Sequence, residues 1–176
     1  MIMKKFYKKY QFYLLPIFLI FVLSFSRLIP HPSNFTPIIA TGIFAGFYFK
    51  QFYLSLLIVI FSMFIGDLFL GFHSTMFFTY ISLSAAVVVG FFIKDLKFNK
   101  ILYSGLSSSI IFYVITNFGV WFSTALYEKS LTGLMQSYIM AIPFFHNTLI
   151  STLIYLAVFK LVFDLSIKKI IIKKYI

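Results

Sequence analysis

Cysteine is absent from this chain of 176 residues, and acidic residues are scarce, with four Asp and Glu against fifteen Lys and Arg. The absence of cysteine excludes disulfide bonds, thiolate metal sites and a cysteine nucleophile. The sequence also lacks a glycine-rich P-loop, so any ATP hydrolysis linked to this protein must come from a partner. No pair of histidines has the short spacing typical of a zinc site. These absences leave the long apolar segments as the main source of information.

Apolar residues make up 61% of the sequence, charged residues make up 11%, and the mean hydropathy is +1.00. This composition is typical of a membrane protein, and the long runs without strict alternation favour helices over barrel strands. We predict an all-α polytopic membrane protein with six transmembrane helices in a single domain, 1–176. The second span is short for a hydrocarbon core of about 30 Å, so we expect it to lie partly behind its neighbours. The predicted spans are 11–28, 35–49, 52–70, 76–93, 101–122 and 142–163.

The basic residues predict how these helices are oriented. With the N-terminus in the cytoplasm, thirteen lysines fall on the cytoplasmic side, and only Arg27 and Lys129 lie outside. Both termini are then cytoplasmic. The net charge of +11 reflects this topology, so we expect a lipid bilayer and no nucleic acid as the partner of the basic residues. The cytoplasmic set is Lys4, Lys5, Lys8, Lys9, Lys50, Lys94, Lys97, Lys100, Lys160, Lys168, Lys169, Lys173 and Lys174.

Both ends of the chain have a second interpretation. The basic start, the apolar run and the small residues Ser24 and Ser26 also fit a cleaved signal peptide, whose removal would leave five spans. The C-terminal stretch 167–176, with paired lysines among isoleucines, fits either a stop-transfer anchor or a helix on the inner membrane surface.

Polar side chains collect at the predicted outer ends of the helices. Asp67 lies about one turn inside the outer end of its span, where an ionisable group usually faces a partner or a water-filled cavity. Three prolines stiffen the connection 30–37, which carries His31 and Asn34. We therefore predict a pocket for a small polar solute at this level. The candidate residues are Arg27, His31, Asn34, Asp67, His73, Tyr80, Asn117, Trp121, His146 and Asn147.

Several candidates also have a structural interpretation. Asp67 can form an ion pair with Arg27 that only locks helices together, and Asn117 can be an interhelical hydrogen-bonding group. Trp121 is either an interfacial anchor or a stacking wall for a planar ligand. The three histidines and Asp67 come from separate elements, so we predict neither a metal nor a cofactor.

Small residues at helical spacing allow helices to approach closely, either inside the protein or toward a partner subunit. The candidate partner interface consists of Gly42, Gly46, Ser82, Ala86 and Gly90. Ser130 is predicted to cap a short helix over 131–139, which either roofs the pocket or rests on lipid as an amphipathic connector.

Four motifs carry a resemblance to a known family. They are SRLIPHPSNFTPI at 26–38, the segment 66–73 with its Gly-Asp and Gly-Phe-His, NFGVW at 117–121 and AIPFFHNT at 141–148. They resemble an uncharacterised, DUF6580-like family of small bacterial membrane proteins, which is itself similar to the substrate-binding S components of energy-coupling factor (ECF) vitamin transporters. The resemblance implies a six-helix protein of the bacterial inner membrane that captures a vitamin-like nutrient at its outer face. It also implies a membrane coupling subunit and cytoplasmic ATPases as partners.

The leading hypothesis is a non-catalytic subunit that binds a small polar solute for uptake. A rival hypothesis is an intramembrane enzyme in which Asp67 and the histidines activate water directly or through a metal. A third is a structural or assembly protein whose partners dock on the small-residue faces.

Overall fold

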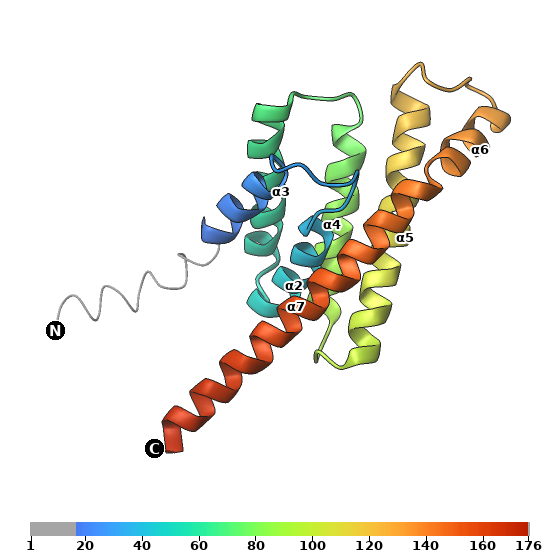
Figure 1. The fold of residues 1–176 in the computed structure, drawn as a ribbon. Coiled ribbons are helices and arrows are strands. Elements are labelled where there is room, and N and C mark those ends of the chain that lie inside the picture. The colour runs from blue at the N-terminus through green and yellow to red at the C-terminus, as the bar shows by residue number, and fades with distance from the viewer. Residues whose placement is uncertain (1–16, 176) are drawn as a thin grey trace.

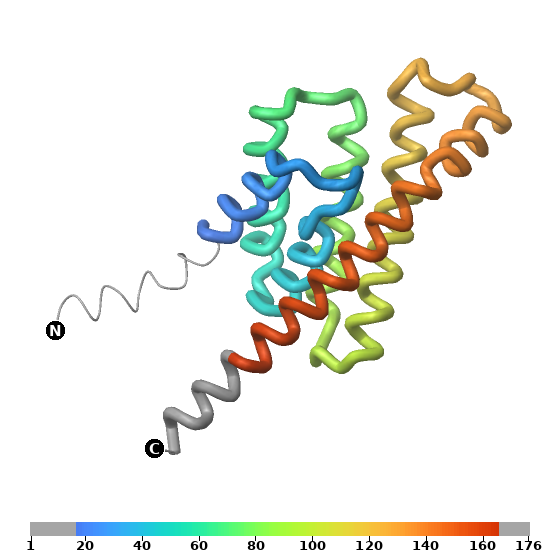
Figure 2. Tube along the Cα trace, in the orientation of Figure 1, coloured from blue at the N-terminus to red at the C-terminus, as the bar shows by residue number. Residues whose placement is uncertain are grey.

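The computed structural model describes the backbone of residues 17–175 and the side chains of residues 17–165 (Figures 1 and 2). Every regular element in this part of the chain is a helix, which confirms the all-α part of the predicted fold class. After the helical segment Ile17–Ser26, the helices are α2 (Ile38–Phe49), α3 (Phe52–Leu70), α4 (Met76–Phe92), α5 (Phe98–Ser123), α6 (Leu131–Met140) and α7 (Ile142–Tyr175). The start of the first predicted span, 11–16, and Lys4, Lys5, Lys8 and Lys9 lie outside the described residues, as do the side chains of Lys168, Lys169, Lys173 and Lys174.

Among the described residues, three helices are long and apolar enough to cross a membrane, namely α3, α5 and the part of α7 from Ile142 to Leu165. They indicate a membrane protein. By contrast, α2 has only 12 residues, which corresponds to about 18 Å at 1.5 Å per residue and falls short of a hydrocarbon core of about 30 Å. The predicted second span, 35–49, therefore nearly coincides with α2, but α2 is too short to cross a bilayer. The six-span topology stays a prediction.

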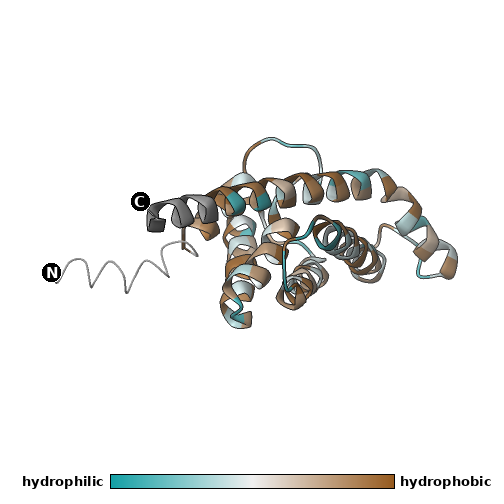
Figure 3. Cartoon of the chain, turned by 90° about the horizontal axis from the view of Figure 1, so that it is seen from below, coloured by the Kyte–Doolittle hydropathy of each residue, from teal (hydrophilic) through white to brown (hydrophobic). Residues whose placement is uncertain are grey.

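The short helix α2 lies at the centre of the molecule. It contacts α3, α4, α5 and α7, and nine of its residues are buried. α7 crosses the other helices on one side (Figure 1), so α2 is enclosed by protein. Brown, which marks hydrophobic residues, is the most common colour on the helices in Figure 3. Outside α2, many large apolar side chains are exposed on the surface, among them Phe92 and Phe98. Exposed surface of this kind suits lipid as its surroundings.

The close contact between α2 and α4 explains why both helices have small residues where they meet. A Cβ atom on Gly90 would lie 1.9 Å from the carbonyl oxygen of Ile43, and one on Gly46 would lie 2.4 Å from that of Val87. The two backbones are thus in direct contact, because no side chain separates them. The small residues proposed as a partner interface, Gly42, Gly46, Ser82, Ala86 and Gly90, are all buried within the chain. They serve internal packing in this structure, which is the first of their two interpretations, and their role as a partner interface stays a prediction.

The two ends of the helix bundle differ in the basic residues that they carry. We call the end that carries the connections 50–51 and 93–97 the lysine end, because Lys50, Lys94 and Lys97 belong to it. The connections 71–75 and 124–130 lie at the opposite, upper end (Figure 1). The separation of the thirteen lysines by membrane side, and the orientation of the two ends in a membrane, stay predictions.

Candidate functional site

A pocket of about 540 Å³ lies toward the upper end. The connection 27–37, α3, the start of α4, the second half of α5, α6 and the start of α7 all contribute to its walls. Five predicted site residues line it: Arg27, His31, Asn34, His73 and Asn117. Its other polar lining residues are Ser33, Thr36, Thr75, Thr79, Tyr113, Thr116, Tyr127, Ser137 and Thr148. Segments far apart in the sequence therefore meet at one cavity, which is lined by both polar and apolar side chains.

Beside the pocket, Arg27 and Asp67 form an ion pair. Nη1 of Arg27 lies 2.8 Å from Oδ1 of Asp67 and donates a hydrogen bond of 3.0 Å to the carbonyl oxygen of Met63. The contact with Oδ1 does not have hydrogen-bond geometry, so the attraction there is coulombic. The hydroxyl of Tyr80 donates to Oδ2 of Asp67 at 2.6 Å. Asp67 is buried and, like Tyr80, is not part of the pocket lining, so the two residues adjoin the pocket only through the contact of Asp67 with Arg27.

Gly66 makes room for this ion pair. A Cβ atom at this position would lie 2.5 Å from Nη1 of Arg27 and 3.2 Å from its Cζ. The guanidinium group therefore lies directly against the backbone of α3. Sequence reasoning did not identify Gly66 as a site residue, although the glycine directly before the intramembrane aspartate was a usable signal.

The connection 27–37 is fastened to α7. Nδ2 of Asn147 donates to the carbonyl oxygen of Ser33 at 3.0 Å, and the connection turns through Asn34, which has a φ of 62°. The backbone N–H of Phe35 donates to the carbonyl oxygen of Pro32 at 2.9 Å. Asn147 therefore positions the connection that borders the pocket, and it does not line the pocket itself.

Helix α6 forms another part of the enclosure. Ser130 caps it as predicted, because its Oγ accepts a hydrogen bond of 3.2 Å from the backbone N–H of Gly133. Two hydrogen bonds tie it to α5: the Tyr113 hydroxyl donates to the carbonyl oxygen of Tyr138 at 2.6 Å, and the Tyr138 hydroxyl donates to that of Val114 at 3.0 Å. Because Ser137 and Met140 of α6 line the pocket, α6 has the roofing role that was one of its two interpretations.

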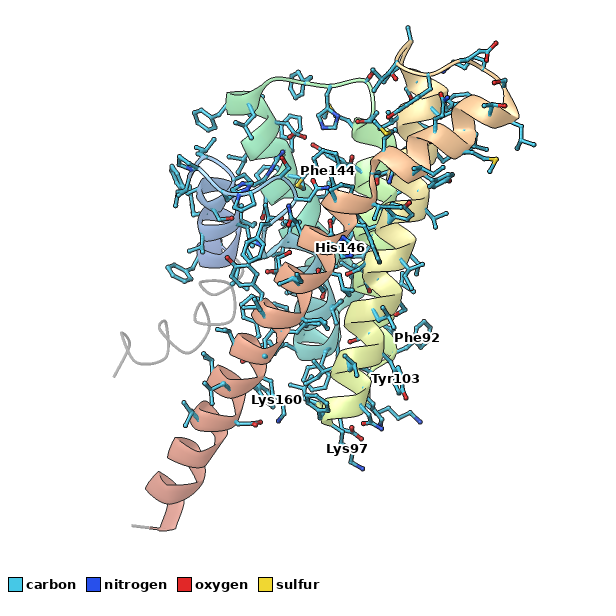
Figure 4. All side chains as sticks on the ribbon, turned by 45° about the vertical axis from the view of Figure 1, so that its right-hand side comes forward. Phe92, Lys97, Tyr103, Phe144, His146 and Lys160 are labelled. Atoms are coloured by element: carbon cyan, nitrogen blue, oxygen red, sulfur yellow. The ribbon has the colours of Figure 1, made fainter. Side chains whose placement is uncertain are left out.

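Trp121 and His146 lie outside the pocket lining. The indole N–H of Trp121 donates to the carbonyl oxygen of Glu128 at 2.9 Å, which ties the end of α5 to the next connection. Lys129 caps the same end of α5 through the carbonyl oxygens of Trp121, Phe122 and Thr124. His146 is exposed on α7, whereas Phe144, two residues earlier, lines the pocket (Figure 4). Trp121 thus connects the end of α5 to the next connection and does not line this pocket.

The two histidines of the pocket make local contacts. Nδ1 of His31 lies 2.9 Å from the carbonyl oxygen of Pro32, and Nδ1 of His73 lies 2.8 Å from Oγ1 of Thr75. Within the described part of the chain, no three side chains of His, Asp or Glu lie close enough together to hold a metal ion. The arrangement offers imidazole rings at the pocket wall without a metal-ligand cluster.

Hydrogen-bond acceptors dominate the polar wall on α4, α5 and α7. The hydroxyls of Thr79, Thr116 and Thr148 each donate to the carbonyl four residues earlier, at 3.2, 2.7 and 2.9 Å. Their remaining capacity is as acceptors. Nδ2 of Asn117 uses one of its two N–H groups to donate to the carbonyl oxygen of Tyr113 at 2.8 Å, and its Oδ1 is an acceptor. Sequence reasoning missed these threonines, because threonine in an apolar helix gives no signal of its own.

The model of a family of unknown function, DUF6580, matches residues 7–173 of the chain. The match covers nearly the whole sequence, and the chain therefore belongs to this family. No curated protein matches the chain significantly, and no solved structure does so either.

Proposed function

We propose that this member of the DUF6580 family is a membrane subunit that binds a small polar solute without changing it chemically. The observation that carries the proposal is the pocket of about 540 Å³, which has polar side chains from α4, α5, α6, α7 and the connections 27–37, 71–75 and 124–130. Ligand pockets for small molecules range from about 300 to 1,000 Å³, so a nutrient of vitamin size fits this volume. The pocket lies toward the end opposite the lysine end, which supports capture from outside.

The chemistry of the wall indicates the class of solute. Thr79, Thr116, Thr148 and Asn117 offer acceptors, so the solute should carry hydroxyl, amide or amine donors. Arg27 brings a positive charge that Asp67 balances at 2.8 Å. The pair as a whole is neutral, which favours a neutral polar solute over a multiply charged one. Phe112 and Phe144 supply apolar surface for the remainder of the solute.

Binding is favoured over bond chemistry by the surroundings of Asp67. A general acid or base must reach its substrate within hydrogen-bond distance or through one water molecule. Asp67 is instead buried behind Arg27, with its second oxygen occupied by Tyr80. The role left for Asp67 is to hold Arg27 at the wall, so the enzyme hypothesis gains no support from Asp67.

For uptake, this subunit would act like an ECF S component in the bacterial inner membrane, with the lysine end in the cytoplasm. Energy would come from a membrane coupling subunit and cytoplasmic ATPases, since this chain has no P-loop. The connection 27–37 and α6 would then have to move to admit or release the solute. The hydrogen bond from Asn147 to Ser33 is the contact that such an opening must break.

The test is a thermal-shift screen of the purified chain in detergent against polar vitamins and nutrients. A binding solute should raise the midpoint of unfolding, and Asn117→Ala should weaken that solute about tenfold, because one hydrogen bond is lost from the wall. Asn99→Ala is the matched control, since it removes the same group near the other end of α5. Equal affinity in the Asn117 and Asn99 variants would contradict the proposed pocket.

A further inference from the structure

A second groove, of about 450 Å³, lies at the lysine end between α4 and α5. Its walls combine apolar and basic side chains, including Val89, Phe92, Lys94, Lys100 and Tyr103. Grooves of this kind, in which cationic groups adjoin apolar helix surface, suit lipid headgroups. We propose that this groove binds one anionic phospholipid, with the phosphate between the two lysines.

The charges around the groove support this assignment. Lys94, Lys97 and Lys100 outnumber Asp95, whose Oδ2 lies 2.7 Å from Nζ of Lys100. Within the described residues, the Lys94 ammonium group has no hydrogen-bond or ion-pair partner. Among the described residues, the ammonium group of Lys97 likewise has no such partner, but Lys97 does not line the groove. The charges of Lys50 and Lys160, by contrast, are engaged. Lys50 donates to carbonyl oxygens at the end of α4, and Lys160 pairs with Asp164 at 2.6 Å.

Not every polar group in the groove can donate a hydrogen bond to a phosphate. Ser104 donates to the carbonyl oxygen of Ile101 at 2.9 Å, and Ser107 donates to that of Ser104 at 3.2 Å. Both hydroxyl protons are therefore used within α5. The donors left for a phosphate are the ammonium groups of Lys94 and Lys100 and the Tyr103 hydroxyl, which matches the preference of an anion for charge-assisted hydrogen bonds.

The apolar surroundings favour a lipid over a soluble anion. Phe92 is 75% exposed and Tyr103 is 66% exposed, and Figure 4 shows both on the same side of the molecule, above the turn at Lys97. Farther along α5, Leu106 and Ile110 are also exposed. A phosphate in the groove would thus have apolar surface directly beside it, which acyl chains cover and a soluble anion does not.

Native mass spectrometry of the full chain in detergent tests this proposal by titration with phosphatidylglycerol and, separately, with phosphatidylcholine. We expect one phosphatidylglycerol molecule to be retained in preference to phosphatidylcholine. Lys94→Gln should weaken phosphatidylglycerol about fivefold, the effect of one lysine beside an anionic lipid. Lys97→Gln is the matched control, because Lys97 is exposed on the same connection and does not line the groove. Asp95→Asn should strengthen binding, because it releases Lys100.

Three results would overturn the proposal. Equal retention of the two lipids would show that the headgroup charge does not matter. Equal losses in the Lys94 and Lys97 variants would show diffuse attraction to the basic end instead of a defined groove. Displacement of phosphatidylglycerol by equimolar glycerol 1-phosphate would show a site for a soluble anion. The unfolding midpoint of each variant, which we expect to be unchanged, verifies that the comparison is made between folded proteins.

Discussion

At the upper end, Arg27 and Asp67 pair with side chains that are 15% and 0% exposed, whereas at the lysine end Lys160 and Asp164 pair with side chains that are 32% and 46% exposed. The first pair is held by protein on nearly all sides and adjoins a pocket. The second is a pair of neighbouring positions on one helix surface. Because the desolvation of an unpaired charge is costly only where water is excluded, the two pairs should respond very differently to the loss of one partner.

The largest expected effect comes from Arg27→Met, which leaves the Asp67 carboxylate buried without its cation. We expect a loss of about 3 to 5 kcal/mol in the free energy of unfolding. Lys160→Met is the matched change at the lysine end, and we expect it to cost at most about 1 kcal/mol. Denaturant unfolding in detergent micelles measures both.

The double variant Arg27→Met/Asp67→Leu sharpens the same comparison. It removes both charges together, so it should recover most of the loss seen in Arg27→Met, as replacement of a buried ion pair by apolar groups often does. If Arg27→Met and Lys160→Met lose equal stability, the distinction between the two ends is wrong.

A smaller effect is expected for Gly66→Ala, since its Cβ would displace the end of the Arg27 side chain and lengthen the contact with Asp67. We expect it to be less stable than Gly42→Ala by about 1 to 2 kcal/mol. Gly42 is the matched control, because a Cβ there would meet its nearest neighbour, Cβ of Ala86, at an ordinary 3.4 Å. Both variants gain the same helix propensity, so the difference reports the contact with Arg27. Equal stabilities would mean that Arg27 adjusts without loss.

The smallest effect concerns pH at the lysine end. The hydrogen bond from Lys100 holds the pKa of Asp95 below its usual value of 3.8. A carboxyl group with a lowered pKa in the folded state adds stability above its unfolded pKa, and that stability is lost as pH falls through the folded pKa. Between about pH 5 and pH 3, the unfolding midpoint of the wild type should therefore fall slightly more than that of Asp95→Asn. Parallel curves for the two proteins would contradict this assignment.

Much of this architecture could be predicted from the sequence, because apolar runs and helix-capping residues act locally. The boundaries of α3 were predicted residue for residue, and Ser130 caps α6 as its position indicated. The grouping of Arg27, His73 and Asn117 at one level followed from counting turns along predicted spans. These predictions depend only on the helical period and on the position of each residue within its helix.

The individual roles of the site residues depend on tertiary contacts and were harder to predict. Trp121 and Asn147 satisfy backbone carbonyls of residues outside their own helices, and no sequence pattern encodes those pairings. Gly46 and Gly90 could face either a partner or another helix of the same chain, and only the packing of α2 against α4 decides between the two. The threonines of the pocket could be recognised as a group only from the structure, which shows their helices side by side.

The most direct test of the central claim is native mass spectrometry of the protein purified from its own membranes, in the wild type and in Asn117→Ala. The proposed function predicts a small-molecule adduct of one-to-one stoichiometry in the wild type, reduced in Asn117→Ala and retained in Asn99→Ala. The mass of the adduct would then identify the solute. The absence of any adduct from all three proteins, with the same protein partners retained by each, would contradict a solute-binding role and favour assembly as the function.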